Sequence, residues 1–81
     1  MMEYRITTSG SREAERIDLA HDLQTGILVE LADEKDDKGH FLAKDERELC
    51  YKLHTDPVRL LKALNILVSR GKIEAAGVKN E

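Results

Sequence analysis

Three histidines and one cysteine are the side chains of this 81-residue chain whose types could bind a metal ion or form a nucleophile–base pair. His21, His40 and His54 are scattered along the chain, without H-E-x-x-H spacing or a close carboxylate arrangement. Cys50 has no neighbour in sequence that would lower the pKa of its thiol, so we interpret it as buried and inert. The chain also contains no Ser/His/Asp set, Gly-rich phosphate loop or paired-carboxylate cleft. We therefore expect no enzyme, no catalytic residue, no metal site and no cofactor.

The acidic stretch from Asp33 to Gly39 invites a calcium interpretation, because carboxylates at alternating positions are typical of calcium-binding loops. Placing Gly39 at the sixth position of an EF-hand loop puts Lys38 at the fifth position and Asp45 at the twelfth. Those positions require an oxygen ligand and a glutamate. We therefore interpret the stretch as a charged turn.

The basic residues suggest a second kind of chemistry, the binding of phosphate groups. Residues 1–44 contain 6 Lys+Arg and 10 Asp+Glu, whereas residues 45–81 contain 7 and 6, within a net charge of −3. The segment from Pro57 to Lys72 has no acidic residue and four basic ones, Arg59, Lys62, Arg70 and Lys72. This cluster fits a nucleic-acid contact surface. It equally fits a solvated helix face with cations near the helix C-terminus.

The elements that position these residues begin with a predicted short strand from Glu3 to Thr7, with Tyr4 and Ile6 on one face. Ser11 is the predicted N-cap of the following helix. A helical pattern then extends from Arg12 to about Lys35, and we expect it to break near His21–Thr25, giving two helices or one kinked helix. With a lone cysteine and no zinc spacing, this small core has no covalent or metal staple.

The second half of the chain has clearer signals for where helices begin and end. Asp45, with Glu48 three residues later, predicts the start of a helix that carries Leu49 and Leu53. Asp56 as N-cap and Pro57 at the first position predict the next helix. Its core side would be Leu60, Leu64 and Leu67, and Gly71 would end it in a left-handed conformation. Lys72–Val78 is a predicted strand with Ile73 and Ala75 facing inward.

This order of elements resembles the winged helix-turn-helix superfamily over Gly26–Ala76. The similarity is most specific in E-L-C-Y-K-L-H-T-D-P-V-R-L-L-K-A-L-N-I-L-V-S-R-G-K-I-E, which is similar to the family's two central helices and first wing strand. The resemblance implies a mainly α fold with a small β-wing (α+β). It would be a three-helix winged helix-turn-helix at 21–81, preceded by a strand and helix extension at 1–20 that could serve as an oligomerisation element. The second wing strand is almost missing, since only Val78–Glu81 follow Gly77.

In that family the third helix lies in the DNA major groove and the wing contacts the backbone or the minor groove. The resemblance therefore implies double-stranded DNA as partner and a role as transcriptional regulator or replication accessory. The implied nucleic-acid-binding residues are Thr55, Arg59, Lys62, Asn65, Lys72 and Lys79.

The same helix departs from the family pattern, because Val58, Leu61 and Val68 form an apolar stripe on the side that should face the groove. The alternative function is a winged-helix interaction module that holds a protein partner and does not bind DNA. If the stripe is covered within the chain or its homodimer, DNA is favoured. If the stripe is bare in the monomer, a protein partner is favoured.

The sequence also carries expectations about where the protein works. No apolar run approaches the roughly 18 residues of a membrane span, and the opening MMEYRITTSG does not read as a signal peptide. We therefore expect a cytoplasmic protein without membrane contact, and either a homodimer or a complex with another protein.

Overall fold

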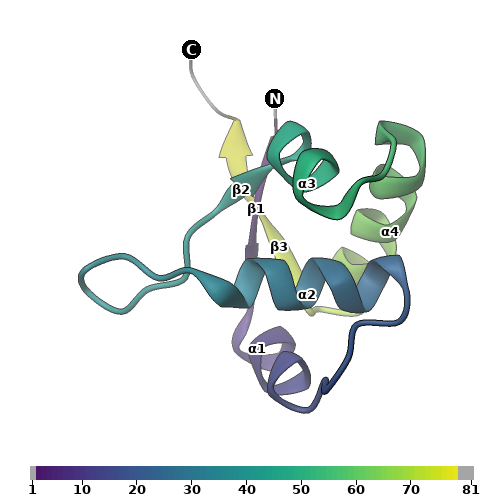
Figure 1. Ribbon diagram of the computed structural model, residues 1–81. Helices are drawn as coiled ribbons and strands as arrows, with labels where there is room; N and C mark the ends of the chain where they lie inside the picture. The colour runs from purple at the N-terminus through teal and green to yellow at the C-terminus, as the bar shows by residue number, and fades with distance from the viewer. Residues whose placement is uncertain (1, 79–81) are drawn as a thin grey trace.

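The N-terminal strand forms the centre of a three-stranded antiparallel sheet in the computed structural model, which describes residues 2–78 (Figure 1). Strand β1 (Met2–Ile6) pairs on one side with the two-residue β2 (Lys44–Asp45) and on the other with β3 (Ile73–Val78). The predicted first strand is confirmed, and its Tyr4 and Ile6 are buried. Because four helices accompany this sheet in the described residues, the fold is α+β.

The sequence interpretation found almost no second wing strand. In the structure the strand beside β3 is β1, from the opposite end of the chain, with Ile6 opposite Ile73 and Tyr4 opposite Ala75. Residues 79–81 of the expected wing, which include the predicted nucleic-acid contact Lys79, lie outside the described residues. Ile73 is buried as predicted, but Ala75 is exposed, because β3 is an edge strand that continues past the helices (Figure 1).

The first predicted helix is two separate helices, α1 (Thr8–Glu15) and α2 (Leu23–Asp33). The prediction of Ser11 as N-cap is wrong. Thr7 is the N-cap, and its hydroxyl oxygen accepts a hydrogen bond from the Gly10 amide at 3.1 Å. Thr7 takes this position because its hydroxyl also donates to the Gly71 carbonyl at 2.7 Å. This contact joins distant chain segments, so local spacing does not reveal it.

The second half of the chain follows the predicted boundaries. Helix α3 (Glu46–Leu53) begins after Asp45, whose carboxylate accepts from the Glu48 amide at 2.8 Å. Helix α4 (Pro57–Ser69) begins after Asp56 and ends before Gly71, which has a φ of +73°. Both predicted N-caps and the left-handed glycine are therefore confirmed.

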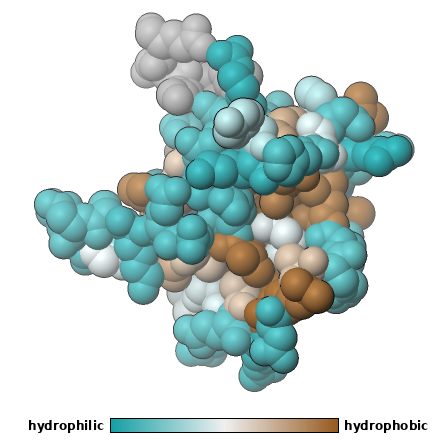
Figure 2. Space-filling model, viewed as in Figure 1, coloured by the Kyte–Doolittle hydropathy of each residue, from teal (hydrophilic) through white to brown (hydrophobic). Residues whose placement is uncertain are grey.

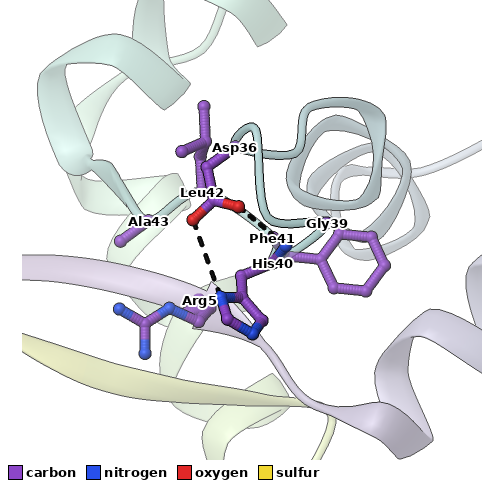
Figure 3. A pocket seen from close by; sticks show the side chains of 7 residues that line it. All are labelled: Arg5, Asp36, Gly39, His40, Phe41, Leu42 and Ala43. Carbon is purple, nitrogen blue, oxygen red and sulfur yellow. Dashed lines mark hydrogen bonds and ion pairs between the residues drawn. The ribbon is translucent and has the colours of Figure 1, made fainter.

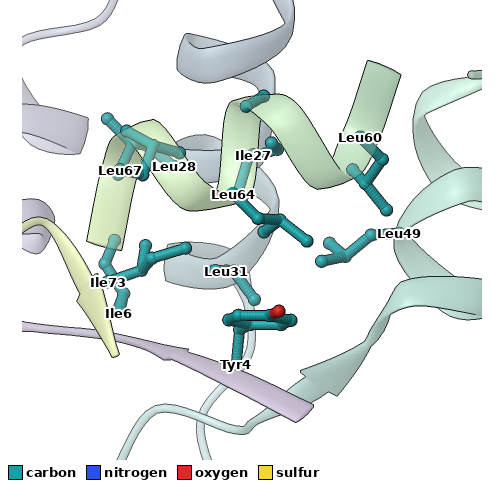
Figure 4. Close-up of a cluster of buried hydrophobic side chains, with 11 residues drawn as sticks. Tyr4, Ile6, Ile27, Leu28, Leu31, Leu49, Leu60, Leu64, Leu67 and Ile73 are labelled. Carbon is teal, nitrogen blue, oxygen red and sulfur yellow. The ribbon is translucent and has the colours of Figure 1, made fainter. Parts of the chain in front are cut away.

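The core lies between α2, α4 and the sheet. Leu64 and Leu67 of α4 point toward α2, while Tyr4, Ile6 and Ile73 close the core from the sheet side (Figure 4). The predicted core stripe of α4 is confirmed, because Leu60, Leu64 and Leu67 are all fully buried. One cluster thus joins residues from both ends of the chain. No helix within residues 2–78 is long and apolar enough to span a bilayer.

Candidate binding surface

The turn between α3 and α4 fixes how α4 leaves the core. His54 adopts a left-handed conformation with φ of +52°, and its amide donates to the Cys50 carbonyl. The Thr55 amide donates to the same carbonyl at 3.1 Å, and the Asp56 carboxylate accepts from the Arg59 amide at 2.9 Å. Three residues therefore join two packed helices, and hydrogen bonds to the Cys50 carbonyl and the Asp56 carboxylate fix the turn.

Helix α4 buries one side completely and leaves an apolar stripe exposed on the other. Val58, Leu61 and Val68 are 68%, 42% and 40% exposed. At 100° per residue these three side chains lie within a quarter-turn of one another, with Asn65 between them. Brown, apolar atoms are visible over α4 on the right of Figure 2. The stripe is therefore exposed in the monomer, and this exposure favours a protein partner over DNA.

The polar edge of α4 carries Arg59 and Lys62, both exposed. Arg59 forms an ion pair with Asp56, in which the Arg59 Nε lies 3.5 Å from a carboxylate oxygen. Lys62 has no ion pair within residues 2–78. Ile66 lies along this edge and is also exposed. Asn65 is exposed and Thr55 is half-buried. The structure therefore brings Arg59, Lys62 and Asn65 onto one helix.

The other two residues of the predicted basic cluster point elsewhere. Arg70 Nη2 lies 3.1 Å from a Glu13 carboxylate oxygen, and its Nη1 donates to Gln24. Lys72 Nζ donates to Ser9 Oγ at 3.0 Å and lies 3.6 Å from the same Glu13 oxygen. Helix α1 thus engages both cations. The four basic residues that are close in sequence are not one surface.

Lys44 is a structural residue that sequence reasoning missed. Its side chain is almost fully buried, and its Nζ donates to the Glu30 carbonyl at 2.9 Å and to Glu34 Oε1 at 3.4 Å. It therefore ties β2 to the end of α2. A lysine in a short extended segment is ordinarily solvated, and nothing in its spacing distinguishes this one.

The residues that sequence analysis tested for metal or catalytic chemistry do not converge. Asp36 Oδ1 accepts from the amides of Lys38 and His40, each at 2.9 Å, and these bonds lower the pKa of the Asp36 carboxyl, the His40 amide most. This turn lines a pocket of about 490 Å³ beside β1, made by Arg5, Asp36, Gly39, His40, Phe41, Leu42 and Ala43 (Figure 3). Across residues 2–78 no three His, Cys, Asp or Glu side chains are placed to hold a metal ion.

Cys50 is half-buried beside the core. Burial raises the pKa of its thiol, and the carboxylates of Asp56 and Glu46 raise it further. A thiol with a raised pKa carries little thiolate near neutral pH, so Cys50 is a poor nucleophile.

Three comparisons with known proteins identify no family for this chain. A scan against protein-family models found no match, and searches of curated proteins and of solved structures likewise returned none. Function therefore has to be inferred from the surface of the chain itself.

Proposed function

We propose that this protein is an interaction module that holds a protein partner on the exposed side of α4. The observation that carries the proposal is the apolar stripe of Val58, Leu61 and Val68, exposed on a helix whose opposite side is fully buried. Contiguous exposed apolar side chains cost free energy in water, and this cost is recovered when a partner covers them.

The charge around the stripe defines the partner. Pro57–Ser69 contains Arg59 and Lys62 and no acidic residue. A second copy docked helix to helix would bring the same cations together, with no carboxylate in Pro57–Ser69 of either copy to face them. A helix that presents apolar side chains flanked by carboxylates would satisfy both features of α4. We therefore assign the surface to an acidic amphipathic helix of another protein.

A winged helix-turn-helix architecture is part of this proposal. It is supported by the order helix, short strand, helix, tight turn, helix, strand across α2, β2, α3, α4 and β3, which is the order expected from the resemblance. In this interpretation β1 supplies the strand that the stub of a wing lacks.

Double-stranded DNA is the second candidate partner. Three exposed polar residues of α4, Arg59, Lys62 and Asn65, favour it, together with the absence of acidic residues on the helix. Fluorescence anisotropy with random duplex DNA tests it, because nonspecific phosphate contacts dominate at about 50 mM salt. Binding that is lost in the Arg59→Ala plus Lys62→Ala double variant supports the DNA candidate, and no binding at this salt concentration eliminates it.

The protein partner is tested with a synthetic peptide of about 14 residues, which matches the length of α4. The peptide carries leucines at three- and four-residue spacing with glutamates beside them, and it is labelled for fluorescence anisotropy. A matched peptide has lysines in place of the glutamates. We expect the glutamate peptide alone to bind, with Leu61→Asp weakening its binding at least about tenfold.

The control variant is Val29→Asp, which places the same new charge at a residue of similar exposure on α2. It should leave peptide binding unchanged. Equal binding of both peptides, or equal loss in both variants, would show that the stripe and its cations do not select the partner.

A further inference from the structure

A pocket of about 390 Å³ lies where α1 meets the junction between α4 and β3. It is lined by polar residue types, half of them cationic: Thr8, Ser9, Arg12, Glu13, Arg16 and Lys72. It is separate from the apolar stripe of α4. Of its residues, only Lys72 belongs to the nucleic-acid set that the resemblance implied.

The backbone on one side of this pocket is held firmly. The Thr7 amide donates to the Lys72 carbonyl at 3.0 Å, and the Thr7 hydroxyl donates to the Gly71 carbonyl. Gly10 packs so closely that an added Cβ would lie 1.9 Å from the Lys72 carbonyl oxygen. The first turn of α1 and Lys72 are therefore fixed relative to one another. The Lys72 side chain reaches back across this turn to Ser9 Oγ.

The charges around the pocket do not balance. The lining contains one carboxylate, Glu13, and three cations, Arg12, Arg16 and Lys72. Glu13 forms ion pairs with Lys72 and with Arg70, which lies outside the pocket at 3.1 Å from the carboxylate. Arg12 and Arg16 form no ion pair within residues 2–78, and both are exposed. Arg12 lies in the last turn of α1 and Arg16 is the C-cap residue four positions later, so their like charges repel each other. Excess positive charge is thus concentrated here in a chain whose net charge is −3.

We propose that this pocket binds a phosphate group. Guanidinium groups bind phosphate oxygens in a bidentate manner, and the Lys72 ammonium adds a further charge. The hydroxyls of Thr8 and Ser9 provide donors beside them. The phosphate belongs either to a nucleic-acid backbone or to a small phosphorylated molecule, since the recognising chemistry is the same for both.

The test compares wild-type protein, Arg12→Gln plus Arg16→Gln, and a control, Arg47→Gln plus Lys52→Gln. The control removes two exposed cations from α3 and so changes net charge equally. Binding of inorganic pyrophosphate is followed by amide chemical shifts. Binding of random duplex DNA is followed by fluorescence anisotropy, and both titrations are made at about 50 mM salt. Circular dichroism checks that each variant is folded.

We expect the α1 variant to bind at least about tenfold more weakly than wild type, with the control less affected. Pyrophosphate shifts at Thr8–Arg16 and Lys72 would identify a small phosphate as sufficient. Duplex binding alone, with a salt slope reduced by about one to two in the α1 variant, would identify the nucleic-acid backbone as the source. The proposal is overturned if wild type binds neither probe, or if both variants lose binding equally.

Discussion

Lys44 shows how much of this fold depends on one side chain. Only 3% of the residue is exposed, and its ammonium is held by the Glu30 carbonyl and the carboxylates of Glu30 and Glu34. A buried charge is tolerated only when hydrogen bonds and opposite charges replace its lost water. The contact links β2 to the end of α2, two segments that are otherwise joined by a long charged loop.

We predict that Lys44→Ala lowers the free energy of unfolding by about 1–3 kcal/mol, because it removes a charge-assisted hydrogen bond and the packing of the aliphatic stem. Urea denaturation monitored by circular dichroism measures this change. Lys38→Ala, in the exposed turn, is the control and should leave the unfolding midpoint unchanged. A Lys44→Ala protein as stable as wild type would mean that Lys44 is not structurally important.

Gly10 and Gly26 make a matched pair of predictions. A Cβ at position 10 would meet the backbone of Lys72 at 1.9 Å, whereas at position 26 it would meet only the end of the Leu53 side chain, at 3.2 Å. We predict that Gly10→Ala destabilises the protein by about 1–3 kcal/mol through overpacking. Gly26→Ala should be close to neutral, since the better helix propensity of alanine offsets the contact. Thermal unfolding of the two variants side by side measures the difference, and equal midpoints would contradict the prediction.

The residues that sequence spacing identified are those whose neighbours are near in sequence. Leu60, Leu64 and Leu67 were predictable because three- and four-residue spacing defines one side of a helix. The roles of Lys44 and Glu13 were not, since Lys44 binds residues of the preceding helix across a loop and Glu13 binds Arg70 from the other end of the chain. Such contacts depend on the tertiary fold and leave no periodic signal.

At the level of elements, the helix starts divide in the same way. Asp45 and Asp56 were predictable N-caps, because an acidic residue before a helical pattern and a proline at the first position are local signals. For α1 the local signal at Ser11 was misleading, because the hydroxyl of Thr7 also contacts the carbonyls of Gly71 and Lys72, across the fold. The pairing of β1 with β3 joins the two ends of the chain and has no turn to mark it.

The N-cap of α2 should make the stability of this helix depend on pH. The Thr25 amide and hydroxyl donate to the Asp22 carboxylate and hold its pKa below the ordinary 3.8. A lowered folded-state pKa stabilises the protein above the unfolded pKa, and this stabilisation disappears as pH falls through the folded value. We predict that the stability difference between wild type and Asp22→Ala is constant above about pH 5 and narrows below about pH 4.

Urea unfolding across this pH range measures the difference. Asp22→Asn keeps a hydrogen-bond acceptor at the cap without a titrating group. Its stability relative to Asp22→Ala should therefore stay the same at every pH. A wild-type difference that does not narrow in acid would show that the carboxylate charge contributes nothing to capping α2.

For the whole molecule, the net charge of −3 is a poor guide to what binds. The acidic side chains of the turn after α2 are exposed, while α4 carries cations and no carboxylate. Two of the four clustered cations are engaged by Glu13, so composition along the chain overstated the basic surface of α4. The apolar stripe could be predicted from spacing alone. Its exposure could not, because that depends on where α1 and β1 pack.

Amide chemical-shift mapping with the glutamate peptide is the most direct test of the central claim that α4 is a protein-binding surface. We predict shifts confined to Val58–Ser69 and the adjoining turn, and their loss in Leu61→Asp but not in Val29→Asp. Shifts centred on another surface, or none at peptide concentrations that saturate other helix-binding modules, would contradict the claim.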